Sequence, residues 1–221
     1  MSAALLVANA SGEIVVQAGA GLGLANSRFA FLPSDNPLLQ TNAQQCVENL
    51  LRGGPNLNST AISVLADYLA LSTTCHLFAG WRYLGQSAYA MADAARHASL
   101  HLAYYAELRA AMAILASAGI GILDTCHFSI NSQGIVKTCG YLDQCGSFPA
   151  IGVASDRIPT HRATWQCLKE WSQLPASSQL VLGQFNVFGR DGADWIAAFG
   201  ASATTPICWL ADWSIDLKSL K

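Results

Sequence analysis

The longest apolar stretch of the chain covers residues 96–122, RHASLHLAYYAELRAAMAILASAGIGI. Between residues 100 and 118 it contains no Gly or Pro, it consists mostly of residues that favour a helix, and it is too long for a strand. Apolar residues occur almost all round this helix, which is typical of a helix buried inside a protein. Glu107 and Arg109 near its centre argue against a membrane span, because charged side chains are costly in lipid. Gly119 and Gly121 are expected to end the helix.

Further helical spacing precedes this stretch. Helices are predicted over residues 43–51, 60–80 and 81–96. The break RGGPN at residues 52–56 separates the first from the second, and Ser59 or Thr60 is expected to cap the second. A bend in the helical region 60–96 is expected at Gly80 or Gly85. Helices joined by such short connections pack as an antiparallel bundle.

Shorter patterns on both sides of the bundle predict strands. In residues 4–17 two short β-favouring runs flank Asn-Ala-Ser-Gly at 9–12. In residues 127–139 two short runs flank Asn-Ser-Gln-Gly at 131–134, so each segment predicts a β-hairpin. Loops are expected over residues 18–42 and 140–160, and residues 179–213 are placed only loosely.

A last short helix is predicted after Thr160, which is expected to cap it. Trp165, Leu168 and Trp171 give this helix an apolar face, and Pro175 is expected to end it. The predicted fold is therefore mainly α, of α+β type. An N-terminal hairpin and loop (1–42) precede a helical bundle (43–122), and a hairpin with a C-terminal helical annex (123–221) follows.

The hydrophobic content, charge and cysteine usage of the chain favour some classes of protein over others. Of 221 residues, 52% are hydrophobic and 12% charged, so part of the surface is expected to be covered by a partner protein. The net charge is −2 and no basic block occurs, which argues against tight, sequence-independent binding to nucleic acid. Seven Cys without a CxxC pair, and an N-terminus without the pattern of a secretion signal, indicate a cytoplasmic protein with free thiols. The last residues carry no clear ending signal, so the sequence is also compatible with a piece of a longer chain.

Arg96 and His101 form the first candidate site. A His titrates near neutral pH and an Arg binds phosphate, a pair suited to metal-free cleavage of a phosphodiester by the RNA 2′-hydroxyl. This spacing resembles the R-x4-H motif of the HEPN superfamily of small helical-bundle proteins, and LAYYAELRAAMAILASAGI resembles a helix of many bacterial HEPN proteins. The resemblance covers about residues 60–122. It implies a metal-independent RNase of a bacterial defence or toxin system, often a homodimer, with Arg96 on the phosphate, His101 as general acid/base and Tyr105 in support.

Structural roles are the alternative for the same residues. Arg96 and His97 can cap the helix, and His101 can be a partly buried, hydrogen-bonded histidine. His97 and His101 have the spacing of two metal ligands on a helix, but a third ligand is not near, and free Cys is more often part of a core. No metal is therefore predicted.

A second candidate site combines His161 and Arg162 with Glu107 and Arg109. A polar Thr-His-Arg at a helix N-terminus favours an anion, and the two charges of the central helix can complete a polar pocket. The structural alternative is a capped amphipathic helix, with Glu107 and Arg109 paired internally.

Three functions remain open. They are a HEPN-like RNase, a non-enzymatic interaction or scaffold subunit of a larger complex, and a sensor that binds a nucleotide or small molecule through Arg109, His161 and Arg162. The expected partners are a second copy or other subunits, and RNA for the RNase. No P-loop, GxGxxG with an acidic partner, GxSxG or HExxH occurs, so no cofactor is predicted.

Overall fold

The computed structural model describes residues 3–21, 38, 42–52, 57–124, 126–140, 159–174, 177, 186–187 and 190–191. The chain forms two compact units, Met1–Thr164 and Trp165–Lys221. In the described part of the first unit, helices predominate and three strands form an antiparallel sheet. The described strands of the second unit are β4 (Asn186–Val187) and β5 (Arg190–Asp191), which pair antiparallel. The predicted mainly α fold with small β-hairpins is confirmed.

Helices α1 (Ala3–Asn9) and α2 (Gly12–Gly21) occupy the segment for which we predicted a β-hairpin, so that prediction is wrong. The two helices meet at a bend of 58°. Leu6, Val7 and Val15 are buried, and their burial stabilises the helices although the two valines favour strands. Local β-preference is weak, and packing overrides it here.

Helix α4 (Ala43–Arg52) confirms the short helix predicted over residues 43–51. Helix α5 (Ser59–Ala92) then runs for 34 residues without a break. The separate helices predicted over residues 60–80 and 81–96 are therefore one helix, and that division is wrong.

Two local contacts explain the length and the start of α5. A Cβ on Gly80 would lie 3.4 Å from the carbonyl oxygen of Ala106, so this glycine permits close packing against the next helix and does not break its own. Gly85 also lies within the continuous helix. The N-cap is Asn58, one residue before the predicted cap, and its side-chain oxygen accepts a hydrogen bond of 2.8 Å from the backbone N–H of Ala61.

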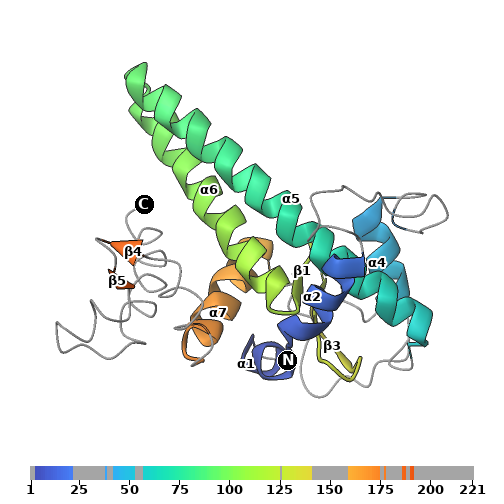
Figure 1. Cartoon of the computed structure of the whole chain (residues 1–221). Coiled ribbons are helices and arrows are strands. Elements are labelled where there is room, and N and C mark those ends of the chain that lie inside the picture. The colour runs from blue at the N-terminus through green and yellow to red at the C-terminus, as the bar shows by residue number, and fades with distance from the viewer. Residues whose placement is uncertain are drawn as a thin grey trace. The chain divides into compact units, whose positions relative to one another are not determined.

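Helix α6 (Arg96–Ser117) follows after a three-residue turn and runs antiparallel to α5 (Figure 1). The prediction of a buried central helix is confirmed for its second half, where Leu108 and Leu115 are buried. The first half differs, since Leu100 is 55% exposed. Gly119 ends this region as predicted, with a φ of 90° that favours glycine.

The sheet consists of β1 (Ile120–Ile122), β2 (Cys126–Ile130) and β3 (Val136–Gly140), paired antiparallel in that order. Strands β2 and β3 confirm the hairpin predicted over residues 127–139. Strand β1 was missed, because its apolar residues continue the pattern of α6 and Gly121 looked like part of the helix stop.

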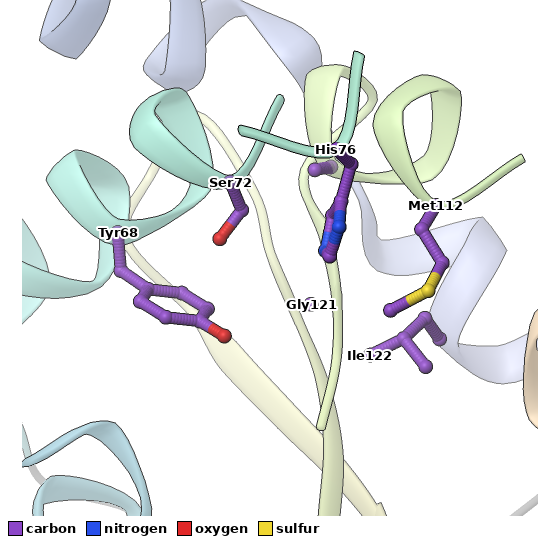
Figure 2. Close-up of a pocket in the computed structure, with 7 residues that line it drawn as sticks. Tyr68, Ser72, His76, Met112, Gly121 and Ile122 are labelled. Atoms are coloured by element: carbon purple, nitrogen blue, oxygen red, sulfur yellow. The ribbon is translucent and has the colours of Figure 1, made fainter. Parts of the chain in front are cut away.

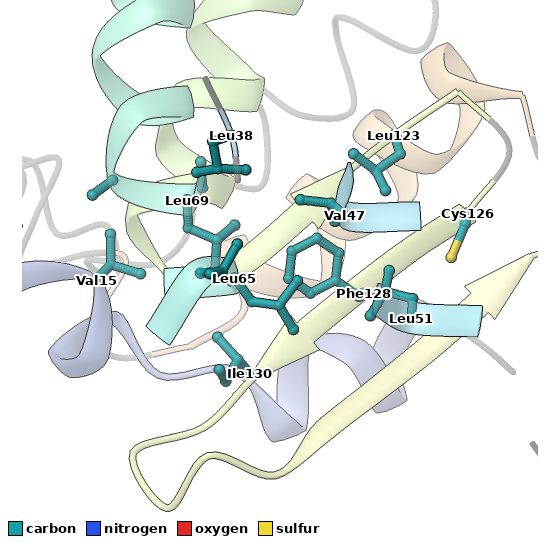
Figure 3. Close-up of a cluster of buried hydrophobic side chains, with 13 residues drawn as sticks. Val15, Leu38, Val47, Leu51, Leu65, Leu69, Leu123, Cys126, Phe128 and Ile130 are labelled. Atoms are coloured by element: carbon teal, nitrogen blue, oxygen red, sulfur yellow. The ribbon is translucent and has the colours of Figure 1, made fainter. Parts of the chain in front are cut away.

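One side of this sheet packs against the helices in the main core. Figure 3 shows Phe128 of β2 among side chains of α4 and α5. The buried members of this cluster are Val15, Leu38, Val47, Leu51, Val64, Leu65, Leu69, Ala70, Ala116, Leu123, Cys126, Phe128 and Ile130.

Helix α7 (Thr160–Ser172) confirms the helix predicted after residue 159. Thr160 lies within the helix, and its hydroxyl donates to the backbone carbonyl of Leu123 at 3.1 Å, which ties the start of α7 to the end of β1. The helix ends at Ser172. Pro175, most of the loops predicted over residues 18–42 and 140–160, and most of the tail 179–213 lie outside the described residues.

Candidate functional site

The predicted catalytic residues Arg96, His101 and Tyr105 all lie on α6. Arg96 is the first residue of the helix, and both Arg96 and His101 are exposed. With 3.6 residues per turn, side chains five positions apart leave a helix about 140° apart, so Arg96 and His101 do not share a face. His101 and Tyr105 are four positions apart and do share one: their rings lie 4.9 Å apart, edge to face.

Tyr105 is the centre of an aromatic cluster that joins α5, α6 and the first turn of α7. Tyr83 of α5 stacks on it at 5.5 Å, and the ring of His161 lies 6.1 Å away, edge to face. His161 also shares a hydrogen bond of 3.0 Å between its Nδ1 and the hydroxyl of Tyr104. These contacts fix the orientation of His161 relative to α6.

A cavity of about 500 Å³ opens beside this cluster. Its lining comes from the second half of α6, the turn after β1 and the start of α7. The lining residues are Tyr105, Leu108, Arg109, Met112, Asp124, Pro159, Thr160 and His161. The volume lies in the range of about 300–1,000 Å³ typical of small-molecule sites, and the lining combines apolar side chains with a few polar ones.

The structure brings together some of the predicted site residues and not others. Tyr105, Arg109 and His161 line the cavity. Glu107 is half-buried outside this lining, and burial raises the pKa of its carboxyl. Arg162 is exposed, also outside the lining.

Asp124 is a polar cavity residue that the sequence interpretation did not include. Thr160, which the sequence analysis grouped with His161 and Arg162 at a helix N-terminus, also lines the cavity. Asp124 could have been found only by recognising β1, since it lies just after that strand.

Arg109 is held from the opposite helix. Its Nη1 donates to Nδ1 of His76 of α5 at 3.1 Å. Since a guanidinium only donates, Nδ1 accepts, and the neutral ring carries its proton on Nε2. Burial, together with the charge of Arg109, lowers the pKa of His76 from 6.5 to about 4, so the ring is neutral at physiological pH.

The guanidinium also retains an unused donor. The Nε of Arg109 is buried and has no hydrogen-bond partner among the described residues. No ion pair between Arg109 and Glu107 occurs in the described part of the chain, and the partner of Arg109 is His76 instead. A buried donor without a partner costs about 1–3 kcal/mol.

His76 lines a second, much smaller cavity. Figure 2 shows side chains of α5 facing Met112 and Ile122 across it. Its volume of about 10 Å³ is close to what one water molecule needs. Burial raises the pKa of the Tyr68 hydroxyl at its edge, where Ser72 is a hydrogen-bond partner. This cavity is too small for a ligand.

The chain contains two adjacent Cys-His pairs, Cys75-His76 and Cys126-His127, whose side chains are of the types that bind metals. His76 accepts the hydrogen bond from Arg109, while Cys126 and His127 are buried in β2. Burial raises the pKa of the Cys126 thiol to about 12, which disfavours the thiolate that binds metals. Among the described residues, no three His, Cys, Asp or Glu side chains form a group that could hold a metal ion.

The larger cavity therefore offers a ligand four groups: the fixed guanidinium of Arg109, the imidazole of His161, the ring of Tyr105 and the exposed carboxylate of Asp124. This combination suits a ligand that carries both an anionic group and a planar one. No family model, curated protein or solved structure matches the chain.

Proposed function

We propose that the chain binds a small phosphate-bearing ligand of nucleotide size in the cavity between α6 and the start of α7. The observation that carries this proposal is Arg109, a half-buried side chain that lines the cavity together with His161 and whose guanidinium is held by His76. A phosphate oxygen is a strong acceptor for a guanidinium N–H.

The other lining residues fit the rest of such a ligand. The ring of Tyr105 is held by His101, Tyr83 and His161, so it presents a fixed surface on which a base can stack. His161 adds an imidazole beside Arg109 in the lining. The carboxylate of Asp124 is an acceptor for sugar hydroxyls or an exocyclic amine.

The test is isothermal titration of the full chain with AMP, GMP, CMP, UMP and inorganic phosphate at pH 7.5. We expect at least one nucleotide to bind, and Arg109→Gln to weaken binding about 10- to 100-fold, the usual effect of losing hydrogen bonds from a charged donor. Arg82→Gln is the matched control, because Arg82 is an exposed arginine of α5 outside the cavity.

Folding must be separated from binding, because Arg109 also bonds to His76. Circular dichroism should show the same helix content in both arginine variants. Tyr105→Leu, which keeps an apolar side chain but removes the aromatic surface, should weaken nucleotide binding more than phosphate binding. Failure of all four nucleotides to bind at millimolar concentration, or equal affinity of Arg109→Gln and wild type, would refute the proposal.

A second candidate is the metal-independent RNase activity, in a bacterial defence or toxin system, that the HEPN resemblance implies. It is supported by one contact: the exposed His101 lies edge-on against Tyr105, whose ring lines the cavity. Arg96 leaves α6 in another direction, so within one chain it would bind a different phosphate of the RNA.

Cleavage of single-stranded RNA in the presence of EDTA tests this candidate. Wild type should cleave, His101→Ala and Arg96→Ala should lose at least 100-fold in rate, and His97→Ala, the adjacent exposed histidine, should not. Equal rates for wild type and His101→Ala would remove the RNase candidate and leave the binding proposal standing.

A non-enzymatic interaction subunit is the third candidate. Its support is the set of large apolar side chains that remain exposed on α5, such as Trp81, which is 65% exposed. It does not compete with ligand binding, because these side chains do not line the cavity.

A further inference from the structure

The C-terminal half of α5 has two rows of apolar or uncharged residues along its length, which we call seams. Helix α6 covers one of these seams. The covered seam is His76, Gly80, Tyr83 and Ser87, spaced four, three and four residues apart. Gly80 lies in contact range of α6, and the hydroxyl of Ser87 donates to the backbone carbonyl of Ser99 at 2.8 Å. Small residues thus let the two helices approach closely along this seam.

The second seam is exposed. Leu77, Trp81, Leu84, Ala88 and Met91 repeat the four-three-four-three spacing of a coiled-coil seam along about four turns of the same helix. The first four residues of the exposed seam each follow a residue of the covered seam by one position, and successive residues of a helix are about 100° apart around its axis. The exposed seam therefore points well away from α6. All five residues are exposed. We name these five residues the outer seam.

The exposed apolar area is large enough for an interface. The large apolar side chains on the outer seam or next to it are exposed by 49% (Leu77), 61% (Phe78), 65% (Trp81), 48% (Leu84) and 53% (Met91). With about 150–250 Å² for an aromatic side chain and somewhat less for Leu and Met, they expose on the order of 500–600 Å². A specific protein–protein interface buries at least about 1,000 Å² in total, which is about 500 Å² on each partner.

A membrane is the first alternative occupant. By length and composition α5 could cross a membrane, as could the bent pair α1 and α2 if these two helices form one span, but the core helix of a soluble protein passes the same test. The helical hairpin formed by α5 and α6 also exposes Arg82, Gln86, Arg96 and His101. Lipid insertion of this hairpin would bury these polar groups, and a helix lying flat on a membrane usually has several Lys or Arg, where this part of α5 has Arg82 alone.

We propose that the outer seam is a homodimer interface, in which α5 of one copy packs against α5 of a second copy. The coiled-coil spacing makes the seam self-complementary, as a two-fold interface requires. In an antiparallel arrangement Trp81 of each copy packs against Leu84 of the other, and Leu77 packs against Ala88. No charged residue lies on the seam itself, so no like charges meet. The two hairpins then form a four-helix arrangement.

This inference is independent of the proposed ligand site, because none of the outer-seam residues lines the cavity. The test is the molar mass of the full chain at 1–100 µM by light scattering and sedimentation. For wild type we expect twice the 23.4 kDa of one chain. For the double variant Trp81→Glu, Leu84→Glu we expect the mass of one chain, because its dimer dissociation constant should be at least 100-fold higher.

The matched control is Val16→Glu. Val16 of α2 is 71% exposed and lies outside the outer seam, so this variant should remain a dimer. Circular dichroism should give equal helix content for all three proteins, because the substituted positions are exposed in the single chain. A monomeric wild type at 100 µM, or a double variant that stays dimeric, would overturn the proposal. So would a monomeric wild type that binds phosphatidylcholine–phosphatidylglycerol vesicles through Trp81, since a membrane would then be the occupant.

Discussion

The burial of His76 makes the stability of the folded chain depend on pH in the acid range. The pKa of His76 is about 4 in the folded chain, against an ordinary value of 6.5. Between these values the unfolded chain binds a proton at His76 and the folded chain does not. The free energy of unfolding therefore rises with pH in this window: the contribution is complete above 6.5 and is lost as the pH falls toward 4.

The size of the effect follows from the two pKa values of His76. Their full separation corresponds to about 3.4 kcal/mol, of which about 2 kcal/mol falls between pH 7.5 and pH 5.0. Because the ring is only partly buried and solvent screens its charge, we expect a loss of about 1–2 kcal/mol over this interval.

The assay is urea unfolding at pH 7.5, 6.0 and 5.0, followed by circular dichroism. His76→Asn keeps an acceptor for Arg109 close to the position of Nδ1 but does not titrate. Wild type should lose about 1–2 kcal/mol more than this variant between pH 7.5 and 5.0. His97→Asn, a change at an exposed histidine, should behave like wild type. Parallel pH profiles for wild type and His76→Asn would show that His76 is not the buried neutral acceptor described above.

Five further substitutions test the fold by thermal unfolding. Gly119→Ala should destabilise the chain by about 2 kcal/mol or more, because φ is 90° and the new Cβ would lie 2.6 Å from a backbone oxygen, whereas Gly85→Ala, with open space around it, should stabilise by about 0.5–1 kcal/mol. Equal effects would contradict this. Asn58→Ala should lower the free energy of unfolding by about 1 kcal/mol, and Ser59→Ala by much less. A larger loss for Ser59→Ala would mean that Ser59, as predicted from the sequence, is the N-cap. Asn9→Ala removes a buried amide that donates to backbone carbonyls at 3.1 and 3.2 Å, and should cost about 2–3 kcal/mol; a neutral result would mean that water replaces it.

Local patterns were sufficient for much of the fold. The helix over residues 43–51, the long helical region that ends at Gly119, the hairpin after Ile122 and the helix after residue 159 all follow from periodicity and from turn residues close by in the chain. These signals are local because a helix or hairpin forms its hydrogen bonds between near neighbours in sequence.

The failures have an equally physical origin. Residues 4–17 favour strands by at most about 1 kcal/mol, while burying side chains such as Leu6 contributes about 2 kcal/mol each, so packing decided in favour of α1 and α2. Gly80 looked like a helix break, because the helix that packs against it lies some 26 positions further along the chain, at Ala106. Local preference has no information about such a partner.

The same limit applies to the candidate site. From the sequence, Arg109 was a candidate as a charged residue in an apolar helix, His161 as part of a polar helix N-terminus, and Tyr105 as a residue that the HEPN resemblance implies. Only the tertiary structure placed these three around one cavity and gave Arg109 the neutral acceptor His76, 33 positions earlier in the chain. The burial that shifts the pKa of His76 and leaves Nε of Arg109 without a partner arises from the packing of α5 on α6, because desolvation depends on neighbours in space and not on neighbours in sequence.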